Sequence, residues 1–193
     1  MAHFYRYDTP GTLPVTSSSL ASFDGFDDAT ADLVAPDGTT ESIAAVLADG
    51  SLTVDVPILD QVGLYRLQVS VTGPGVSRAL EPGLIPVEEI DAAWHTIDSA
   101  RREWDGAPQD DARLYTLLET ARTQCIAYAP ATLIVPPHYR AAQVLQARNI
   151  WNASKTDPGA SSMNADGFTV TVFPLDWTVR QLLRPIQGRP VVA

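Results

Sequence analysis

The residue types that could perform metal, acid–base or nucleophilic chemistry are few and widely spaced in this sequence. Its histidines are His3, His95 and His138, and no spacing of histidines and carboxylates resembles a metal site. We expect His95 to be a surface or fully hydrogen-bonded residue within a helix. Cys125 falls on the apolar stripe of another expected helix, where a buried structural thiol is expected rather than a nucleophile. The sequence therefore predicts neither an enzyme nor a metal or cofactor site.

Paired carboxylates and paired arginines have simpler explanations than chemistry. Asp27–Asp28 and Asp110–Asp111 could suggest calcium binding or a carboxylate pair, but a loop start and a helix cap explain them more simply. Arg101–Arg102 could face DNA, yet Glu103 and Asp105 beside them balance the charge that a phosphate track needs. The sequence contains no Gly-x-Ser-x-Gly elbow, phosphate loop or dinucleotide fingerprint.

Charge divides the chain near Ile90. The 193 residues carry a net charge of −10, from 23 acidic and 13 basic residues. Residues 1–90 hold 13 acidic and three basic residues, a net charge of −10, and residues 91–193 hold ten of each, a net charge of zero. This asymmetry predicts two units with different surroundings, and the acidic unit would repel nucleic acid. Acidic loops that keep a small domain soluble explain the same charge.

Residues 1–87 have the pattern of an antiparallel β-sandwich. Short runs, several of them with alternating apolar residues, are bounded by turn residues such as Pro36-Asp37-Gly38 and Asp49-Gly50. The expected strands are Ala31–Ala35, Ser42–Ala48, Ser51–Val56, Leu64–Val71 and a last strand that begins at Val76–Leu80 and continues toward Val87.

One of these strands carries a resemblance to immunoglobulin-like domains. The segment Gly63–Val69 is similar to their penultimate strand, in which a tyrosine near the strand start commonly forms a corner contact. Tyr65 is either such a corner tyrosine or an ordinary half-buried strand aromatic. The cysteine pair and core tryptophan of antibody domains are missing, so the resemblance implies only an Ig-like or fibronectin-like sandwich, and that fold alone selects no function.

Residues 88–193 have the 3.6-residue period of helices, which together form a small bundle. Helices are expected over Glu88–Trp104, from Asp110 or Asp111 to Tyr128, over about Tyr139–Ala153 and over Trp177–Leu183. Asp110 or Asp111 would cap the second helix, Pro137 would lie in the first turn of the third, and Asp176 would cap the last. The fold class predicted for the whole chain is α+β with two domains, 1–87 and 88–193.

The helical half also contains segments without a helical period. Residues 154–167 form a polar loop that we expect to be mobile in an isolated subunit and ordered against a partner. Phe168–Phe173 alternates as a short strand, and residues 186–193 form an extended tail. The tail is either a frayed terminus or a segment that adds to a neighbour's sheet edge or groove.

The order of the helical motifs resembles the head-to-tail connector proteins of long-tailed bacteriophages, also called adaptor or head-completion proteins. The matching pieces are Asp110–Leu118, Pro136–Gln143, Ala147–Trp151 and Pro174–Pro185. The resemblance covers residues 88–193. The compact form of the family lacks an N-terminal sandwich, so residues 1–87 are a departure, although Ig-like modules are familiar appendages on phage structural proteins.

The resemblance implies a virion structural protein at the capsid vertex, in the neck region, assembled in the host cytoplasm. The protein would form a ring of identical subunits, generally dodecameric, that docks on the portal protein and receives the next neck, stopper or tail component. DNA would pass through the ring without sequence-specific binding, and no membrane or cofactor is implied. The alternative is an Ig-like binding module, attached to the virion, that recognises a capsid protein or a surface glycan.

Tryptophans and the tail supply the candidate contact residues. The helical half contains Trp94, Trp104, Trp151 and Trp177, which either fill its core or exceed what that core can absorb and favour interfaces. The residues expected to contact the portal or a neighbouring subunit are Trp151, Trp177, Arg184, Arg189, Val191 and Val192. The residues expected to have structural roles are Tyr65, Asp110, Pro137 and Asp176.

Overall fold

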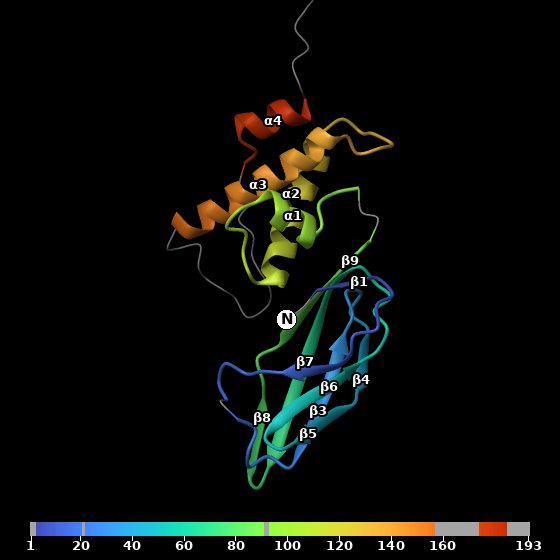
Figure 1. The fold of residues 1–193 in the computed structure, drawn as a ribbon, viewed down its shortest axis with the longest axis vertical. Helices are drawn as coiled ribbons and strands as arrows, with labels where there is room; N and C mark the ends of the chain where they lie inside the picture. Colours follow the sequence, from blue (N-terminus) through green and yellow to red (C-terminus); the bar gives the residue numbers. More distant parts are fainter. Residues whose placement is uncertain (1–2, 21, 91–92, 157–173, 185–193) are drawn as a thin grey trace, which may run out of the picture. The chain divides into compact units, whose positions relative to one another are not determined.

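The chain consists of two compact units, residues 1–90 and 91–193. The structure, a computed structural model, describes residues 3–20, 22–90, 93–156 and 174–184. Its fold is α+β, with strands β1 to β9 in the first unit and helices α1 to α4 in the second (Figure 1). Each unit has its own buried apolar residues, and the division falls three residues beyond the expected boundary at Val87.

The first unit is sandwich-like and contains two sheets. The larger has the strand order β1-β9-β7-β3-β4, with β8 paired to β7, and the smaller has the order β2-β6-β5. The strand pairs are antiparallel except β1 with β9, which is parallel. The bounds are β1 Phe4–Tyr5, β2 Gly11–Val15, β3 Asp28–Val34, β4 Thr40–Ile43, β5 Ala45–Ala48, β6 Ser51–Val56, β7 Gly63–Gly73, β8 Val76–Ala79 and β9 Gly83–Glu88.

The alternation of β6 and β7 places apolar side chains on the core face of both sheets, as the sequence predicts. In β6 the buried residues are Leu52, Val54 and Val56, and β7 buries every second residue from Tyr65 to Val71. The intervening residues of β6 are polar. The prediction of strands at Ser51–Val56 and Leu64–Val71 is therefore confirmed.

Two expected strands are wrong because each is interrupted. The run Ser42–Ala48 is divided between β4 in the larger sheet and β5 in the smaller, because the chain changes sheets at Ala44. The expected strand from Val76 to Val87 is divided into β8 and β9, which pair with opposite ends of β7. Pro82 lies in the interruption, where it has no N–H to donate to a strand ladder. β1 and β2 were not expected as strands.

The second unit contains α1 (Ile97–Glu103), α2 (Asp111–Tyr128), α3 (Pro137–Thr156) and α4 (Trp177–Leu183). The carboxylate of Asp110 caps α2 by accepting from Arg113 N at 2.8 Å. Asp176 caps α4 by accepting from Val179 N at 2.9 Å. Pro137 is the first residue of α3, where its missing N–H has no cost.

The expected first helix, Glu88–Trp104, is wrong in its first half. Glu88 ends β9, and Ile90, one of the apolar residues in the helical period of this run, is exposed. The helix begins at Ile97 because Thr96 and Ser99 form a capping box: the Thr96 hydroxyl accepts from Ser99 N at 3.4 Å and the Ser99 hydroxyl accepts from Thr96 N at 2.9 Å.

Burial along α3 does not follow a single apolar stripe. Ala141 and Arg148 are exposed, whereas Gln143 and Gln146 are fully buried. The reason is that α3 packs against both α2 and α4, so more than one stripe of the helix is covered. Residues 154–156 belong to the last turn of α3 rather than to the expected loop. The rest of that loop, the expected strand Phe168–Phe173 and the tail 186–193 lie outside the described residues.

Candidate interaction surface

Among the described residues, neither a metal-binding cluster nor a reactive cysteine is found. No three His, Cys, Asp or Glu side chains among them gather as a metal site would require. Cys125 is completely buried, and burial raises the pKa of its thiol to about 12, so it stays a protonated thiol near neutral pH. Among the described helices, none is both long and apolar enough to cross a membrane.

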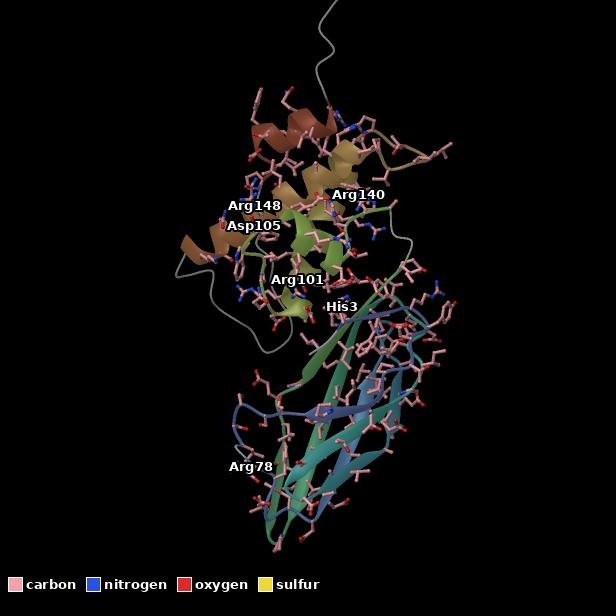
Figure 2. All side chains as sticks on the ribbon, viewed as in Figure 1. His3, Arg78, Arg101, Asp105, Arg140 and Arg148 are labelled. Carbon is pink, nitrogen blue, oxygen red and sulfur yellow. The ribbon has the colours of Figure 1, made fainter. Side chains whose placement is uncertain are left out.

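The arginine pair in the last turn of α1 does not form a free cationic track, because Arg101 is engaged within the helical unit. Arg101 donates from Nη2 to the carbonyl oxygen of Gln109 at 2.8 Å and forms an ion pair with Asp111 at 2.6 Å. These contacts tie the end of α1 to the start of α2. Figure 2 shows Arg101, Arg140 and Arg148 on the helical unit, where they come from α1 and from opposite halves of α3. The Arg101 side chain is therefore held by contacts within its own unit.

The four tryptophans divide between core and surface. Trp94 and Trp104 are buried in the two apolar clusters of the helical unit. Trp177 opens α4 and is 69% exposed. Trp151 is partly buried, with the Arg113 guanidinium carbon 4.4 Å and the Lys155 ammonium 4.5 Å from its ring centroid. Of the tryptophans expected at an interface, Trp177 is the one whose ring is open to a partner.

The remaining candidate contact residues are either held by contacts within the helical unit or lie outside the described residues. Arg184 lies over the Tyr128 ring, 4.6 Å from its centroid, and donates from Nε to the Tyr128 carbonyl oxygen at 2.7 Å. It therefore fastens the end of α4 to the end of α2. Arg189, Val191 and Val192 fall outside the part of the chain that the structure describes.

The structure adds an exposed apolar segment that sequence reasoning missed. Residues 129–136 connect α2 to α3, and we call them the apolar connection. Leu133 at its tip is fully exposed, Ile134 is 82% exposed, and Ile126 in the last turn of α2 is exposed as well. The available signal was the triplet Leu-Ile-Val directly before two prolines, which is unusual for a solvated loop. Because large exposed aliphatic side chains lie close together in the chain here, we take this segment as the candidate interaction surface of the helical unit.

The base of the apolar connection is anchored to the helical unit. The Tyr139 hydroxyl donates to the Pro130 carbonyl oxygen at 3.3 Å, and Val135 packs against the apolar cluster that contains Cys125 and Val179. Because both ends of the connection are held, Leu133 and Ile134 project from a fixed base. The connection can thus present its apolar tip with little further loss of conformational entropy on binding.

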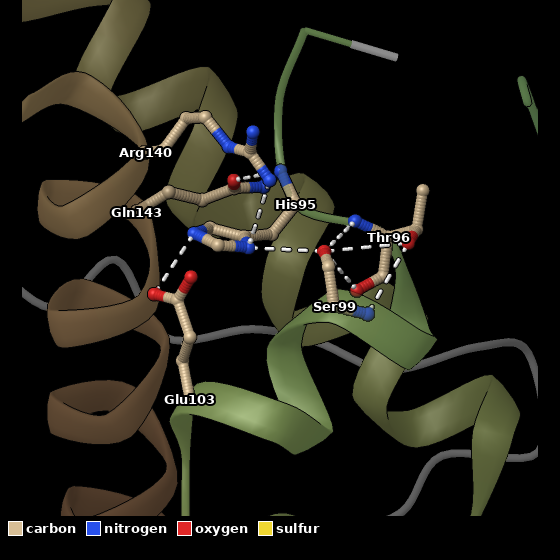
Figure 3. A network of polar contacts seen from close by, with 6 residues as sticks. All are labelled: His95, Thr96, Ser99, Glu103, Arg140 and Gln143. Carbon is tan, nitrogen blue, oxygen red and sulfur yellow. Dashed lines mark hydrogen bonds and ion pairs between the residues drawn. The ribbon is translucent and has the colours of Figure 1, made fainter. Parts of the chain in front are cut away.

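A buried polar network lies where the chain enters the helical unit (Figure 3). The His95 backbone N–H donates to Gln143 Oε1 at 2.8 Å, and Gln143 Nε2 donates to the Leu118 carbonyl oxygen at 3.1 Å. The His95 ring lies 3.0 Å from the Ser99 hydroxyl through Nδ1 and 3.4 Å from a Glu103 carboxylate oxygen through Nε2. Arg140 Nη2 approaches Nδ1 at 3.5 Å. His95 is therefore buried and fully hydrogen-bonded.

In the sandwich unit, the Tyr65 hydroxyl is hydrogen-bonded to the turn that precedes β7. The hydroxyl accepts from the Gln61 backbone N–H at 3.0 Å and donates to Asp60 Oδ1 at 3.2 Å. These contacts fix the turn that leads into β7, with Tyr65 buried near the start of that strand. Burial and the neighbouring Asp60 carboxylate raise the pKa of the Tyr65 phenol, so its hydroxyl remains a donor across the neutral range.

Comparison with known proteins assigns no family to this chain. Neither family models nor curated proteins match it. Among solved structures, a DUF4785 family protein from Legionella pneumophila is similar with a TM-score of 0.31 and 18% sequence identity. The similarity covers 45% of this chain and 26% of that protein, so the chain spans about a quarter of its length. A likeness at this level identifies neither function nor partner.

Proposed function

We propose that the protein is a virion structural protein, a head-to-tail adaptor whose helical unit assembles into a ring that docks on a portal protein. The observation that carries the proposal is the exposure of Leu133, Ile134 and Trp177 on a unit whose other large apolar residues are mostly buried. The resemblance of residues 88–193 to connector proteins supplies the partners: further copies of the chain, the portal and the next neck or tail component. The ring would be dodecameric.

The energetics of the exposed residues support a partner of this kind. Burying a Leu or Ile side chain contributes about 1.5–3 kcal/mol, and aromatic residues are enriched in the cores of interfaces. The tip of the apolar connection and Trp177 can therefore contribute several kcal/mol on association. Arg102, Arg148 and Arg180 are also exposed on the helical unit, where polar contacts could surround an apolar contact.

We also infer that the first unit is an Ig-like domain. The strand orders β1-β9-β7-β3-β4 and β2-β6-β5 correspond to the two sheets of that architecture, with β3, β7 and β9 as its C, F and G strands. Tyr65 then occupies the corner position of the F strand, beside the turn from the E strand. In the adaptor this acidic domain would be an appendage on the ring.

The test is assembly of the full chain with its portal. Mass measurement and electron microscopy of the mixture should show a ring, and a Leu133→Ser/Ile134→Ser double variant should lower ring formation at least about tenfold. A double variant of the sandwich unit, Val46→Ser/Ile58→Ser, is the matched control because it also removes two exposed aliphatic side chains. If wild-type protein and portal form no ring, or if both double variants assemble equally well, the proposal fails.

The alternative function is a binding module in which the Ig-like unit recognises a capsid protein or a surface glycan. The corner contact of Tyr65 and the strand order favour it, because they describe a self-contained module with its own core. Deletion of residues 1–87 separates the two functions. An adaptor should still assemble on the portal without these residues, whereas a virion-attached binding module should lose its only binding activity.

A further inference from the structure

The segment that begins the helical unit is held in place by side-chain contacts rather than by its own helix. α1 has seven residues, too few for an isolated helix to be stable in water. Trp94 stacks on Tyr139 of α3 with ring centroids 6.4 Å apart, and the His95 backbone N–H donates to Gln143 of the same helix. The His95 side chain, 1% exposed, closes this segment against α3. His95 follows Ile90, the last residue of the sandwich unit, by five positions.

The neighbours of the His95 ring select one neutral form of the imidazole. Glu103 on α1 faces Nε2 with a carboxylate, which only accepts hydrogen bonds, so Nε2 carries the proton. Arg140 on α3 faces Nδ1 with a guanidinium, which only donates, so Nδ1 is an acceptor. The Ser99 hydroxyl lies 3.0 Å from the same nitrogen and 3.1 Å from the Thr96 carbonyl oxygen, and its one proton can be donated to either acceptor. A neutral ring with its proton on Nε2 therefore satisfies both charged neighbours.

A second proton on the ring would disturb this arrangement. It would add to Nδ1, where an N–H would face the N–H groups of Arg140 and a positive charge would stand 3.5 Å from another. Glu103 would favour the imidazolium, but its side chain is 57% exposed, so water screens the attraction. Burial outweighs that attraction and, together with Arg140, lowers the pKa of His95. The Leu118 carbonyl is the contribution of α2 to the network and is uncharged.

We propose that His95 is a pH-sensitive latch: its neutral ring holds residues 94–103 on α2 and α3, and its protonation releases them. The segment includes all of α1 and leads from the sandwich unit into the helical unit. Release would free residues 94–103, which link the two units along the chain, while the contacts of α2 with α3 and α4 remain. The latch is independent of the adaptor proposal, because it rests only on contacts inside the helical unit.

The direction of the pH dependence follows from the lowered pKa. In the released segment His95 titrates near its ordinary value of 6.5, and in the closed segment it titrates at lower pH. The released state therefore binds more protons as the pH falls below about 6.5. The equilibrium constant for release rises by up to about tenfold per pH unit until the pKa of the closed state is reached. Well above pH 6.5 the ring is neutral in both states, so protonation no longer favours release.

Hydrogen exchange on the full chain, measured from pH 7.5 to pH 5, tests this directly. Protection factors for residues 94–103 should fall by up to about tenfold per pH unit below 6.5, while those of Leu114–Ala121 in α2 change less. His95→Gln keeps a polar side chain that does not titrate and should abolish the difference. A pH response of residues 94–103 that persists in His95→Gln, or no response in the wild-type protein, would overturn the proposal.

Two substitutions that leave His95 in place distinguish the latch from a purely structural contact. Arg140→Gln should raise the pKa of His95 toward 6.5 and reduce the pH response, whereas Glu103→Gln should lower the pKa and extend the response to lower pH. Nuclear magnetic resonance titration of the His95 ring in the wild-type protein and in both variants reads these shifts. Shifts of equal sign in the two variants would contradict the latch.

Discussion

Arg184 and Tyr128 join the C-terminal ends of α4 and α2 through two contacts made by one guanidinium. Nε donates to the Tyr128 carbonyl oxygen at 2.7 Å, and the guanidinium carbon lies 4.6 Å from the Tyr128 ring centroid. The last carbonyls of a helix have no partner within it, so Arg184 supplies a donor that α2 lacks. The contact stands at the end of α2 where the apolar connection begins, and it holds that end against α4.

Arg184→Ala should therefore loosen α4 and lower the stability of the helical unit by about 1 kcal/mol, the typical contribution of one hydrogen bond. Chemical denaturation and hydrogen exchange of Trp177–Leu183 measure the two effects. Arg180→Ala is the matched control, because Arg180 is exposed on the same helix and its side chain donates a long hydrogen bond to the Asp176 carbonyl, at 3.4 Å. Equal effects of the two substitutions would show that the Tyr128 contact contributes nothing specific.

Tyr65→Phe should destabilise the sandwich unit by about 1 kcal/mol, because it leaves the Gln61 N–H without its acceptor and removes the donor to Asp60. Tyr7→Phe removes a hydroxyl from an exposed tyrosine of the same unit and should change stability by less than about 0.5 kcal/mol. The measurement is hydrogen exchange of β7 in the full chain. A loss of protection as large in Tyr7→Phe would exclude a special role for the contacts of Tyr65 with Gln61 and Asp60.

Burial of the Cys125 thiol makes the stability of the fold depend on pH in the alkaline range. The pKa of the thiol is about 9.0 in an unfolded chain and about 12 in the fold, because burial disfavours the thiolate. The folded state thus binds the proton more tightly, so the stability that this group contributes is present below pH 9 and is lost as the pH rises from 9 toward 12. Cys125→Ala should flatten this part of the stability curve relative to the wild-type protein, since other groups titrate equally in both. If the free energy of unfolding falls with pH equally steeply in Cys125→Ala and in the wild-type protein, the thiol is accessible in the fold.

The helix caps could be predicted from the sequence, whereas the strand break at Ala44 and the burial of Gln143 could not. Asp110 and Asp176 were predictable as caps because a carboxylate before an apolar period has a local reason to bind helix N–H groups. The break at Ala44 was not predictable, because Ser42–Ala48 is a continuous run whose division depends on which sheet each half joins. Gln143 was not recognised either, because a glutamine carries no apolar signal for burial and its partners, Leu118 and His95, lie far away in sequence.

A substitution of Gln143 tests whether hydrogen bonding or apolar contact matters more for stability at this buried position. The Gln143 side chain is fully buried and joins the His95 N–H to the Leu118 carbonyl oxygen. Methionine has nearly the same length and would be favoured at a buried position by its apolar character. We nevertheless expect Gln143→Met to lower stability by about 1–3 kcal/mol, because it leaves the buried N–H of His95 without an acceptor.

Equilibrium denaturation of the full chain measures this loss, and the His95 amide proton gives a local readout. Its exchange should accelerate in Gln143→Met more than that of Leu117, which lies inside α2 and has no hydrogen bond to Gln143 among the described contacts. Gln109→Met, on an exposed glutamine of the same unit, is the control for the substitution itself. A more stable Gln143→Met variant would mean that apolar contact outweighs the bridge, and that the segment before α1 is held chiefly by the stacking of Trp94 on Tyr139.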